Sequence, residues 1–220
     1  MVDQDLNPDQ SAESTDEIVK KQSPSPSRSI VRKIVRGIII FTMIPYLVLF
    51  GLLFISQRSL IYPGSVSGSN KISKAGFPEG QTHELKLKTE DHLELNGWLV
   101  LPKGEKANDL QQAIEFTKNN CNLVLFFPGN AENRQLRVGG ILDFTQLGFA
   151  VLIVDYRGYA DNPGNPSQKW MTKDAIALWD LLTQEYLISN DKIFIFGESL
   201  GGAVAVQLVS DICQKKKSIR

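Results

Sequence analysis

Cysteine, histidine and surplus charge of either sign are scarce in this sequence. Its 220 residues include two cysteines and two histidines, and 24 basic side chains balance 24 acidic ones. No Cys or His spacing matches a metal site, and a chain without a basic surplus lacks the electrostatic footprint of a nucleic-acid binder. A Gly-x₄-Gly-Lys-Ser/Thr phosphate loop is also missing. We therefore expect no metal, no cofactor and no nucleic-acid partner.

The first segment of the chain, residues 1–27, is almost entirely polar. It holds six acidic residues and two lysines, and it ends in Ser23-Pro24-Ser25-Pro26-Ser27. Such a composition cannot bury enough apolar surface to offset the chain entropy lost on folding. We predict a disordered tail over residues 1–27.

An uncharged apolar run occupies residues 37–55. As a helix rising about 1.5 Å per residue, these 19 residues just span a hydrocarbon core of about 30 Å. Only Arg58 follows the run closely, whereas four basic residues precede it, which predicts a cytoplasmic N-terminus by the positive-inside rule. The four are Arg28, Arg32, Lys33 and Arg36.

We interpret residues 28–56 as a basic flank and an uncleaved signal anchor that contacts membrane lipid through residues 37–55. The following domain would then lie on the outer, periplasmic or extracytoplasmic, side. Two alternatives remain, a cleaved signal peptide and a buried helix of a soluble protein. A signal peptide normally has a shorter apolar region and small residues at its cleavage site, and the exit Ser56-Gln57-Arg58 has no Ala-x-Ala pattern.

Beyond a linker at residues 57–80, residues 81–220 have the periodicities of a mixed α/β sheet. Alternating polar and apolar residues at 83–88 and 92–101, on either side of Glu90-Asp91, predict an antiparallel hairpin. Continuous apolar runs then predict strands covered on both faces, as in a parallel sheet. These strands are expected at 122–127, 149–154 and 192–196, and helices at 132–147, 170–186 and 199–214. The predicted fold is thus a hairpin followed by parallel β-α-β-α-β-α with right-handed crossovers.

A Gly-x-Ser-x-Gly pentad lies where the last predicted strand meets the last predicted helix, at Gly197-Glu198-Ser199-Leu200-Gly201. A nucleophile elbow needs this strand–turn–helix setting, because its serine sits on a tight turn that lifts Oγ clear of the sheet. Gly197 and Gly201 leave room for close approach of neighbouring backbone. The alternative is that Ser199 only caps the helix, with the glycines serving packing.

From about Ser59 onward the sequence resembles the α/β-hydrolase superfamily, and more narrowly its small membrane-anchored serine hydrolases. Besides the pentad, three segments carry the resemblance, and they occur in the family's order. They are Gln57-Arg58-Ser59-Leu60-Ile61-Tyr62-Pro63, Phe127-Pro128-Gly129-Asn130-Ala131-Glu132-Asn133, and Asp155-Tyr156-Arg157-Gly158-Tyr159 with Gly164-Asn165-Pro166-Ser167.

The resemblance implies a small acyl substrate, an ester, thioester or amide, that is attacked by Ser199. The backbone N–H groups of Leu200 and Asn130 would form the oxyanion hole. Pro128 replaces a histidine that is frequent in the family, which removes a side-chain contact and leaves the backbone donor unaffected. We expect Arg157 to pair with a carboxylate or carbonyl that holds its loop against the sheet.

A general base is the missing part of this site. Hydrolases of this fold supply the triad in the order Ser, Asp or Glu, and His, but no histidine follows Ser199 and only Asp211 is acidic after it. Asp155 precedes the nucleophile and is not the triad acid. Both histidines, His83 and His92, belong to the hairpin, where we expect them to be exposed.

We interpret the chain as a C-terminally truncated hydrolase with an incomplete sheet. The strand at 192–196 would have an open outer edge, so we expect the isolated chain to be poorly stable. Without a base to take the serine proton, it would also be inactive. The alternatives are a non-catalytic truncated or degenerate product, or an anchored module that binds a partner through the open edge.

Overall fold

The computed structural model describes residues 27–63, 70–131 and 133–218. The tail predicted at residues 1–27 lies outside the described residues except for Ser27. The chain divides into two compact units, Met1–Ile55 and Ser56–Arg220, each of which is described by itself.

The first unit is dominated by helix α1, Arg28–Ile61, which has 34 residues and contains Pro45. Within it, Arg28–Gln57 is long and apolar enough to cross a membrane, and no residue of its most apolar window is buried. The helix continues past Ile55 through the first residues of the predicted linker. A short helix, α2 (Ile72–Ala75), also lies in that linker.

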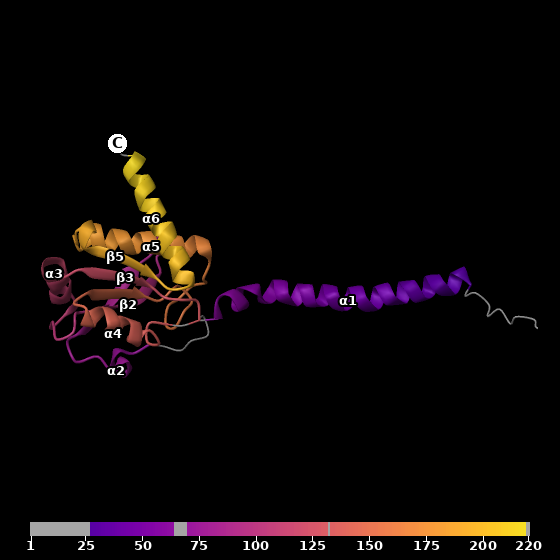
Figure 1. The fold of residues 1–220 in the computed structure, drawn as a ribbon, viewed down its shortest axis with the longest axis horizontal. Coiled ribbons are helices and arrows are strands. Elements are labelled where there is room, and N and C mark those ends of the chain that lie inside the picture. Colours follow the sequence, from indigo (N-terminus) through magenta and orange to yellow (C-terminus); the bar gives the residue numbers. More distant parts are fainter. Residues whose placement is uncertain (1–26, 64–69, 132, 219–220) are drawn as a thin grey trace, which may run out of the picture. The chain divides into compact units, whose positions relative to one another are not determined.

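A mixed sheet forms the centre of the second unit (Figure 1). It has five strands in the order β1-β2-β4-β3-β5. β1 pairs with β2, and β2 with β4, in antiparallel fashion, whereas β3 pairs with both β4 and β5 in parallel fashion. The predicted hairpin and the predicted parallel strands are therefore confirmed. The strands are β1 (Thr82–Lys88), β2 (Glu94–Val100), β3 (Leu123–Phe127), β4 (Ala150–Val154) and β5 (Ile193–Gly197).

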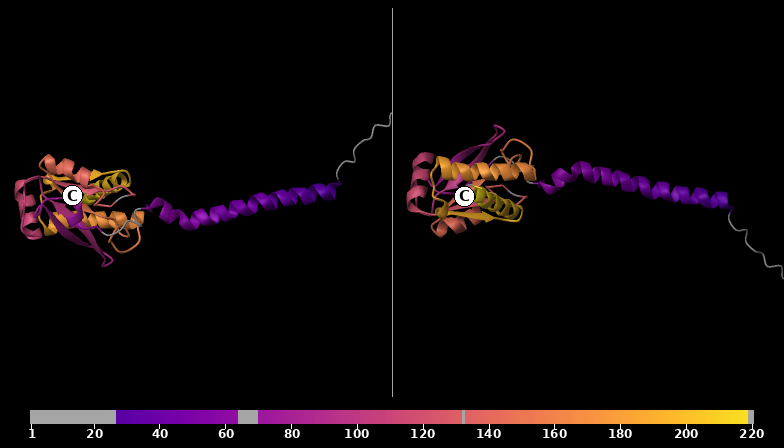
Figure 2. Two further views of the ribbon diagram at one scale, coloured as in Figure 1. Left: turned by 90° about the horizontal axis from the view of Figure 1, so that it is seen from below. Right: turned by 90° about the horizontal axis from the view of Figure 1, so that it is seen from above.

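Helices cover both faces of this sheet because β4 is added on one side of β3 and β5 on the other, so the two crossovers run in opposite directions across the sheet. The crossover from β3 to β4 contains α4 (Val138–Gln146), and the return past β3 to β5 contains α5 (Gln168–Asp180). Right-handed crossovers in opposite directions place their helices on opposite faces. Alternate β3 side chains accordingly join two cores, one with α5 and α6 (Leu200–Ser218) and one with α4. α5 and α6 lie beside each other on their shared face (Figure 2).

Two helix predictions need correction. The helix α3, Leu110–Asn120, was not predicted; it begins at Asp109, whose side chain accepts a hydrogen bond from Gln112 N, and it buries a narrow stripe of side chains. The helix predicted at 132–147 begins later, at Val138. The residues before it form a loop, in which the Asn133 side chain accepts hydrogen bonds from the backbone N–H groups of Gln135 and Leu136.

Among the described residues β5 pairs only with β3, so its outer edge is unpaired, as predicted. Phe194 and Phe196 are 49% and 39% exposed, whereas Ile193 is buried and Ile195 is half-buried. The side chains alternate between the two faces of the sheet, with Ile193 and Ile195 facing the core that α6 covers.

Candidate active site

The ends of β3 and β5 bring two distant loops together. Phe127 is the register partner of Gly197, and the Glu198 N–H donates to the Phe127 carbonyl at 3.0 Å. The crossover helices leave this pair of strands toward opposite faces, and such a switch point is where open α/β sheets form their ligand crevices. The turn after β5 and the loop after β3 therefore meet at the position where a site is expected.

Ser199 occupies a strained turn between β5 and α6. Its φ is +50°, in the left-handed region that non-glycine residues seldom adopt. A Cβ at Gly197 would collide with the Gly201 carbonyl, and a Cβ at Gly201 would collide with the Phe127 carbonyl. Both glycines thus permit the close backbone approach that holds the turn. The predicted strand–turn–helix geometry is present around Ser199.

The loop after β3 lies directly against this turn. A Cβ built on Gly129 would be 3.7 Å from Ser199 Cβ. Asn130 follows Gly129, and its side-chain Nδ2 donates to the Ile61 carbonyl at 3.1 Å. The two predicted oxyanion donors, the N–H groups of Asn130 and Leu200, are thus on segments that flank Ser199.

Two buried tyrosines hold the carbonyl groups of the loop after β3. Tyr156 Oη donates to the Pro128 carbonyl at 2.8 Å, and Tyr159 Oη donates to the Asn130 carbonyl at 3.0 Å. Burial raises the pKa of both phenols above the usual range, so both remain neutral donors. Because the two bonds fix a peptide plane on each side of the Gly129–Asn130 peptide, they orient the Asn130 N–H.

An ion pair joins the same loop to the turn that carries Ser199. Arg137 Nη2 lies 3.0 Å from Glu198 Oε1, and the two side chains are partly exposed. The same Nη2 is 3.3 Å from the position of a Cβ on Gly129. Arg137 therefore braces the loop against the turn at the mouth of the crevice.

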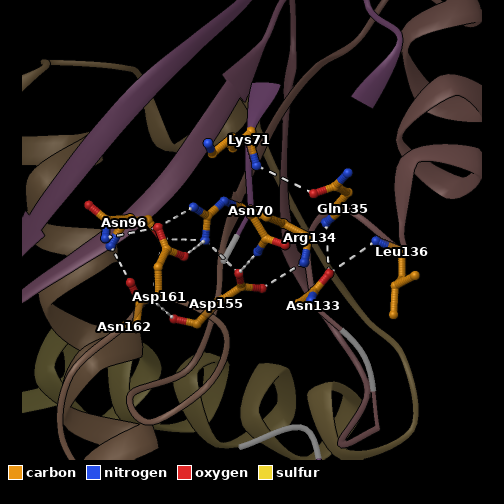
Figure 3. A network of polar contacts seen from close by, with 10 residues as sticks. All are labelled: Asn70, Lys71, Asn96, Asn133, Arg134, Gln135, Leu136, Asp155, Asp161 and Asn162. Carbon is orange, nitrogen blue, oxygen red and sulfur yellow. Dashed lines mark hydrogen bonds and ion pairs between the residues drawn. The ribbon is translucent and has the colours of Figure 1, made fainter. Parts of the chain in front are cut away.

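A buried polar network anchors the far end of the loop (Figure 3). Arg134 Nη1 contacts Asp155 Oδ2 at 2.5 Å, and the Arg134 backbone N–H donates to Asp155 Oδ1 at 2.7 Å. Asn70 Nδ2 donates to the same carboxylate at 2.6 Å, and Asp161 contacts the guanidinium at 3.0 Å. Desolvation of the buried carboxyl raises the pKa of Asp155 to about 6, although the Arg134 charge opposes the shift. The sequence assigned no such role to Arg134.

Arg157 forms a second buried network, away from the Ser199 turn. Its guanidinium binds Asp174 at 2.6–2.7 Å and Asp91 at 2.9–3.1 Å, and it stacks over the Trp170 ring at 4.4 Å. These bonds join the loop after β4 to α5 and to the β1–β2 turn. The predicted pairing of Arg157 with a carboxylate is confirmed.

Neither histidine lies near Ser199. His83 is in β1, and four interstrand spacings of about 4.8 Å separate β1 from β5. Its ring is buried and bonded to the Gly80 carbonyl at 2.9 Å, so the prediction that His83 is exposed was wrong. His83 lies on the same face of β1 as the buried Leu85 and Leu87, which explains this burial. His92 lies exposed in the β1–β2 turn with φ +64°, as predicted.

Comparisons with known proteins agree with the fold described above, because the matches are to α/β-hydrolases. Residues 118–219 match the sequence model of the serine aminopeptidase family S33. An α/β-hydrolase from Vibrio vulnificus of known structure is 26% identical with a TM-score of 0.50, over 62% of this chain and 42% of that one. The chain belongs to the α/β-hydrolase superfamily.

Curated relatives extend the similarity toward the N-terminus. An uncharacterized protein of Mycobacterium tuberculosis strain H37Rv is 31% identical over 193 residues, which are 86% of this chain and 58% of the relative. An uncharacterized membrane protein of Saccharomyces cerevisiae is 31% identical over 71% of this chain and 52% of its own length. Lysophosphatidylserine lipase ABHD12 of Danio rerio is 31% identical over 61% of this chain and 36% of its own length. The chain thus spans about a third to three fifths of the length of these relatives.

Sequence reasoning missed the residues that hold the loop after β3. Tyr156 and Tyr159 were part of a recognised segment but had no assigned function, and Arg137 was not singled out. All three act through partners that lie far away in the sequence or on another loop. The residues next to each of the three in the sequence therefore do not indicate which group its side chain contacts.

Proposed function

We propose that this protein is a membrane-anchored serine hydrolase that cleaves an acyl ester, thioester or amide through Ser199. The observation that carries the proposal is the left-handed Ser199 on its glycine-flanked turn, with Gly129 packed against it. Membership of the α/β-hydrolase superfamily supports it. A serine that only capped a helix would need neither the strained turn nor the adjoining loop.

In the proposed reaction, Ser199 Oγ attacks the acyl carbonyl carbon while a general base takes its proton. The N–H groups of Leu200 and Asn130 stabilise the tetrahedral oxyanion, and the N-terminus of α6 adds its dipole. The intermediate collapses to an acyl-serine as the alcohol, thiol or amine leaves with a proton. Water then attacks the acyl-serine with the same assistance, which releases the acid and restores Ser199.

We further propose that neither His83 nor His92 is the base. His83 is bonded to Gly80 at the opposite edge of the sheet, and His92 lies in the exposed hairpin turn. The described residues then bring no imidazole to Ser199, so the proposed turnover depends on a histidine and an acid other than these. His83→Gln and His92→Gln should leave the hydrolysis rate unchanged. A large loss of rate without unfolding in either variant would refute this assignment.

A hydrolysis assay tests the proposed reaction. Because one relative is named a lysophosphatidylserine lipase, the substrates should include lysophosphatidylserine beside a simple short-chain ester. With the protein isolated from its own membrane, Ser199→Ala should abolish hydrolysis, whereas Ser210→Ala, an exposed serine on the same helix, should retain it. Equal hydrolysis by Ser199→Ala and by the wild-type protein would refute the role of Ser199.

We also propose that α1 is an uncleaved anchor with its N-terminus in the cytoplasm and the hydrolase domain on the outer side. Its length and apolar character support the span, and its basic N-terminal flank supports the orientation. Cys213 is exposed on α6 and serves as a reporter. A membrane-impermeant maleimide should label it in intact cells, with Cys213→Ser as the control. If Cys213 reacts only after permeabilisation, the orientation is reversed.

A non-catalytic binding module is the second candidate function. The observation that favours it is the exposure of Phe194 and Phe196 on edge strand β5, because an open apolar edge can accept another strand. The hydrolysis assay separates the two, since a binding module would show no rate that depends on Ser199.

A further inference from the structure

A groove beside the Ser199 turn has no part in the proposed reaction as described above. Its volume is about 600 Å³, within the usual range of small-molecule sites. The first two turns of α6 form one wall and the start of α5 the other, with Tyr62 at one side. The lining residues include Tyr62, Met171, Leu200, Ala203, Val204 and Val206.

The groove adjoins the proposed reaction centre through Leu200, the residue that follows Ser199. Leu200 lines it and is also the residue whose N–H is proposed to hold the oxyanion. The substrate carbonyl must lie between that N–H and Ser199 Oγ. A group attached to the carbonyl carbon can therefore enter the groove without leaving the oxyanion hole.

The lining favours a neutral, apolar occupant. Among the described residues that line the groove there is no Asp, Glu, Lys or Arg, and its polar side chains are amides and hydroxyls such as Gln168 and Thr172. An anionic head group would find no counter-charge there. Val206 is 72% exposed, so apolar surface stands open to solvent in the absence of an occupant.

We propose that this groove binds the aliphatic acyl chain of the substrate, which makes the protein a hydrolase of lipid-like acyl esters. This inference rests on the proposed function, because it places the acyl carbonyl at Ser199. Each methylene that enters such a groove strengthens binding about fourfold. The groove would thus select medium or long chains over acetyl groups.

Photoaffinity labelling tests the groove independently of catalysis. The full chain carrying Ser199→Ala, in nanodiscs, is irradiated with a lysophospholipid whose acyl chain ends in a diazirine, and the adducts are mapped by mass spectrometry. We expect adducts on the peptides that contain Met171 and residues 203–207. Octanoate, decanoate and dodecanoate should compete with increasing strength, about fourfold for each methylene.

Substitutions that fill the groove with a larger side chain, compared with the same substitution outside it, show whether the labelling depends on the groove. Ala203→Trp and, separately, Val206→Trp should reduce these adducts about tenfold. Both side chains are exposed, so the substitutions should leave the fold intact, as circular dichroism can verify. Val209→Trp is the matched control, since Val209 is exposed on the same helix and is not among the lining residues, and it should keep the adducts.

Adducts confined to residues 37–55, or adducts insensitive to both tryptophans, would overturn the proposal. So would an absence of adducts, which is expected if a protein segment or a second copy fills the groove. Because labelling uses Ser199→Ala, a failure of the proposed hydrolysis leaves this result unaffected, and a failure here leaves hydrolysis of short-chain esters possible.

Discussion

The two buried arginines of the domain have similar surroundings and different consequences. Arg134 and Arg157 both have side chains that are 2% exposed, and each stacks over a tryptophan ring and pairs with two aspartates. Arg157 joins scaffold elements, α5 and the hairpin turn. Arg134 belongs to the loop that carries Asn130, and its partner Asp155 directly precedes Tyr156. The comparison teaches that equal burial can act on the site in different ways, directly through the loop that carries Asn130 for Arg134 and only through the neighbouring tyrosines for Arg157.

Truncation of the central carboxylate in each network should give the largest effects and separate the two roles. Asp155→Ala leaves the Arg134 guanidinium, its N–H and Asn70 without their buried acceptor. Asp174→Ala leaves Arg157 with Asp91 as its remaining acidic partner. Each change should lower the free energy of unfolding at pH 7 by about 3–5 kcal/mol, measured by chemical denaturation.

Turnover should distinguish these two variants. Asp155→Ala releases the loop around Asn130, so the hydrolysis rate at a permissive temperature should fall about a hundredfold. Asp174→Ala should lower the rate per folded molecule much less, because Arg157 keeps its bonds to Asp91 and does not itself contact the loop around Asn130. Similar rate losses in both variants would remove the distinction between the networks.

The pH dependence of stability should differ next. The folded pKa of Asp155 is about 6, above the ordinary value of 3.8, so the folded state retains a proton that the unfolded chain releases. Its contribution to stability therefore falls by about 3 kcal/mol as pH rises from 4 to 6, and is constant above that range. The difference between wild type and Asp155→Ala, measured by denaturation across this range, reports it.

Within the Arg157 network Asp91 should respond in the opposite direction, whereas burial raises the pKa of Asp174 as it raises that of Asp155. Hydrogen bonds from Arg157 hold the pKa of Asp91 below its usual range, so this pair loses stability only in strong acid as Asp91 becomes protonated. For Asp155, a stability difference between wild type and Asp155→Ala that stays constant from pH 4 to 6 would contradict the raised pKa of this carboxyl group.

Removal of one phenol should have a smaller effect on stability. Tyr159→Phe deletes the hydrogen bond to the Asn130 carbonyl, which costs about 1 kcal/mol. Because the Asn130 N–H becomes less well oriented, we expect kcat to fall while KM is unchanged. Tyr186→Phe, a half-buried tyrosine remote from the loop, is the control. Loss of stability with no change in kcat would restrict Tyr159 to a structural role.

The smallest effect is expected at the exposed end of the Arg157 network. Asp91 is 31% exposed, and Arg157 keeps its buried bond to Asp174 when Asp91 is neutralised. Asp91→Asn should therefore lower the melting temperature less than Asp174→Ala and leave the hydrolysis rate unchanged. A shift as large as that of Asp174→Ala would place the main anchor of Arg157 in the hairpin turn.

The strands could be predicted because their side-chain pattern is local. Apolar runs such as 123–127 are buried on both faces, and the alternation of β1 marks a strand with one exposed face. Helix α3 could not be recognised with the same ease, because Leu110–Asn120 is mostly polar and buries few side chains. Its signal was the N-cap at Asp109, which is weak on its own.

The candidate site was only half predictable for a similar reason. The pentad encodes the turn at Ser199 locally, since its glycines meet backbone atoms close to the turn. The braces of the facing loop depend on strand order, which brings Tyr156, Tyr159 and Arg137 to partners on other segments. The burial of His83 was readable from the sequence, because the alternation of β1 puts His83 on the same face as Leu85 and Leu87, and the polarity of the side chain led to the wrong prediction.

The central claim, that Ser199 is an activated nucleophile, is tested most directly by a fluorophosphonate probe. The protein in its own membrane is treated with the probe, and the modified residue is identified by mass spectrometry. The account predicts one adduct on Ser199 that is absent from Ser199→Ala and present in Ser210→Ala. No adduct on the wild-type protein, or an adduct that persists in Ser199→Ala, would contradict it.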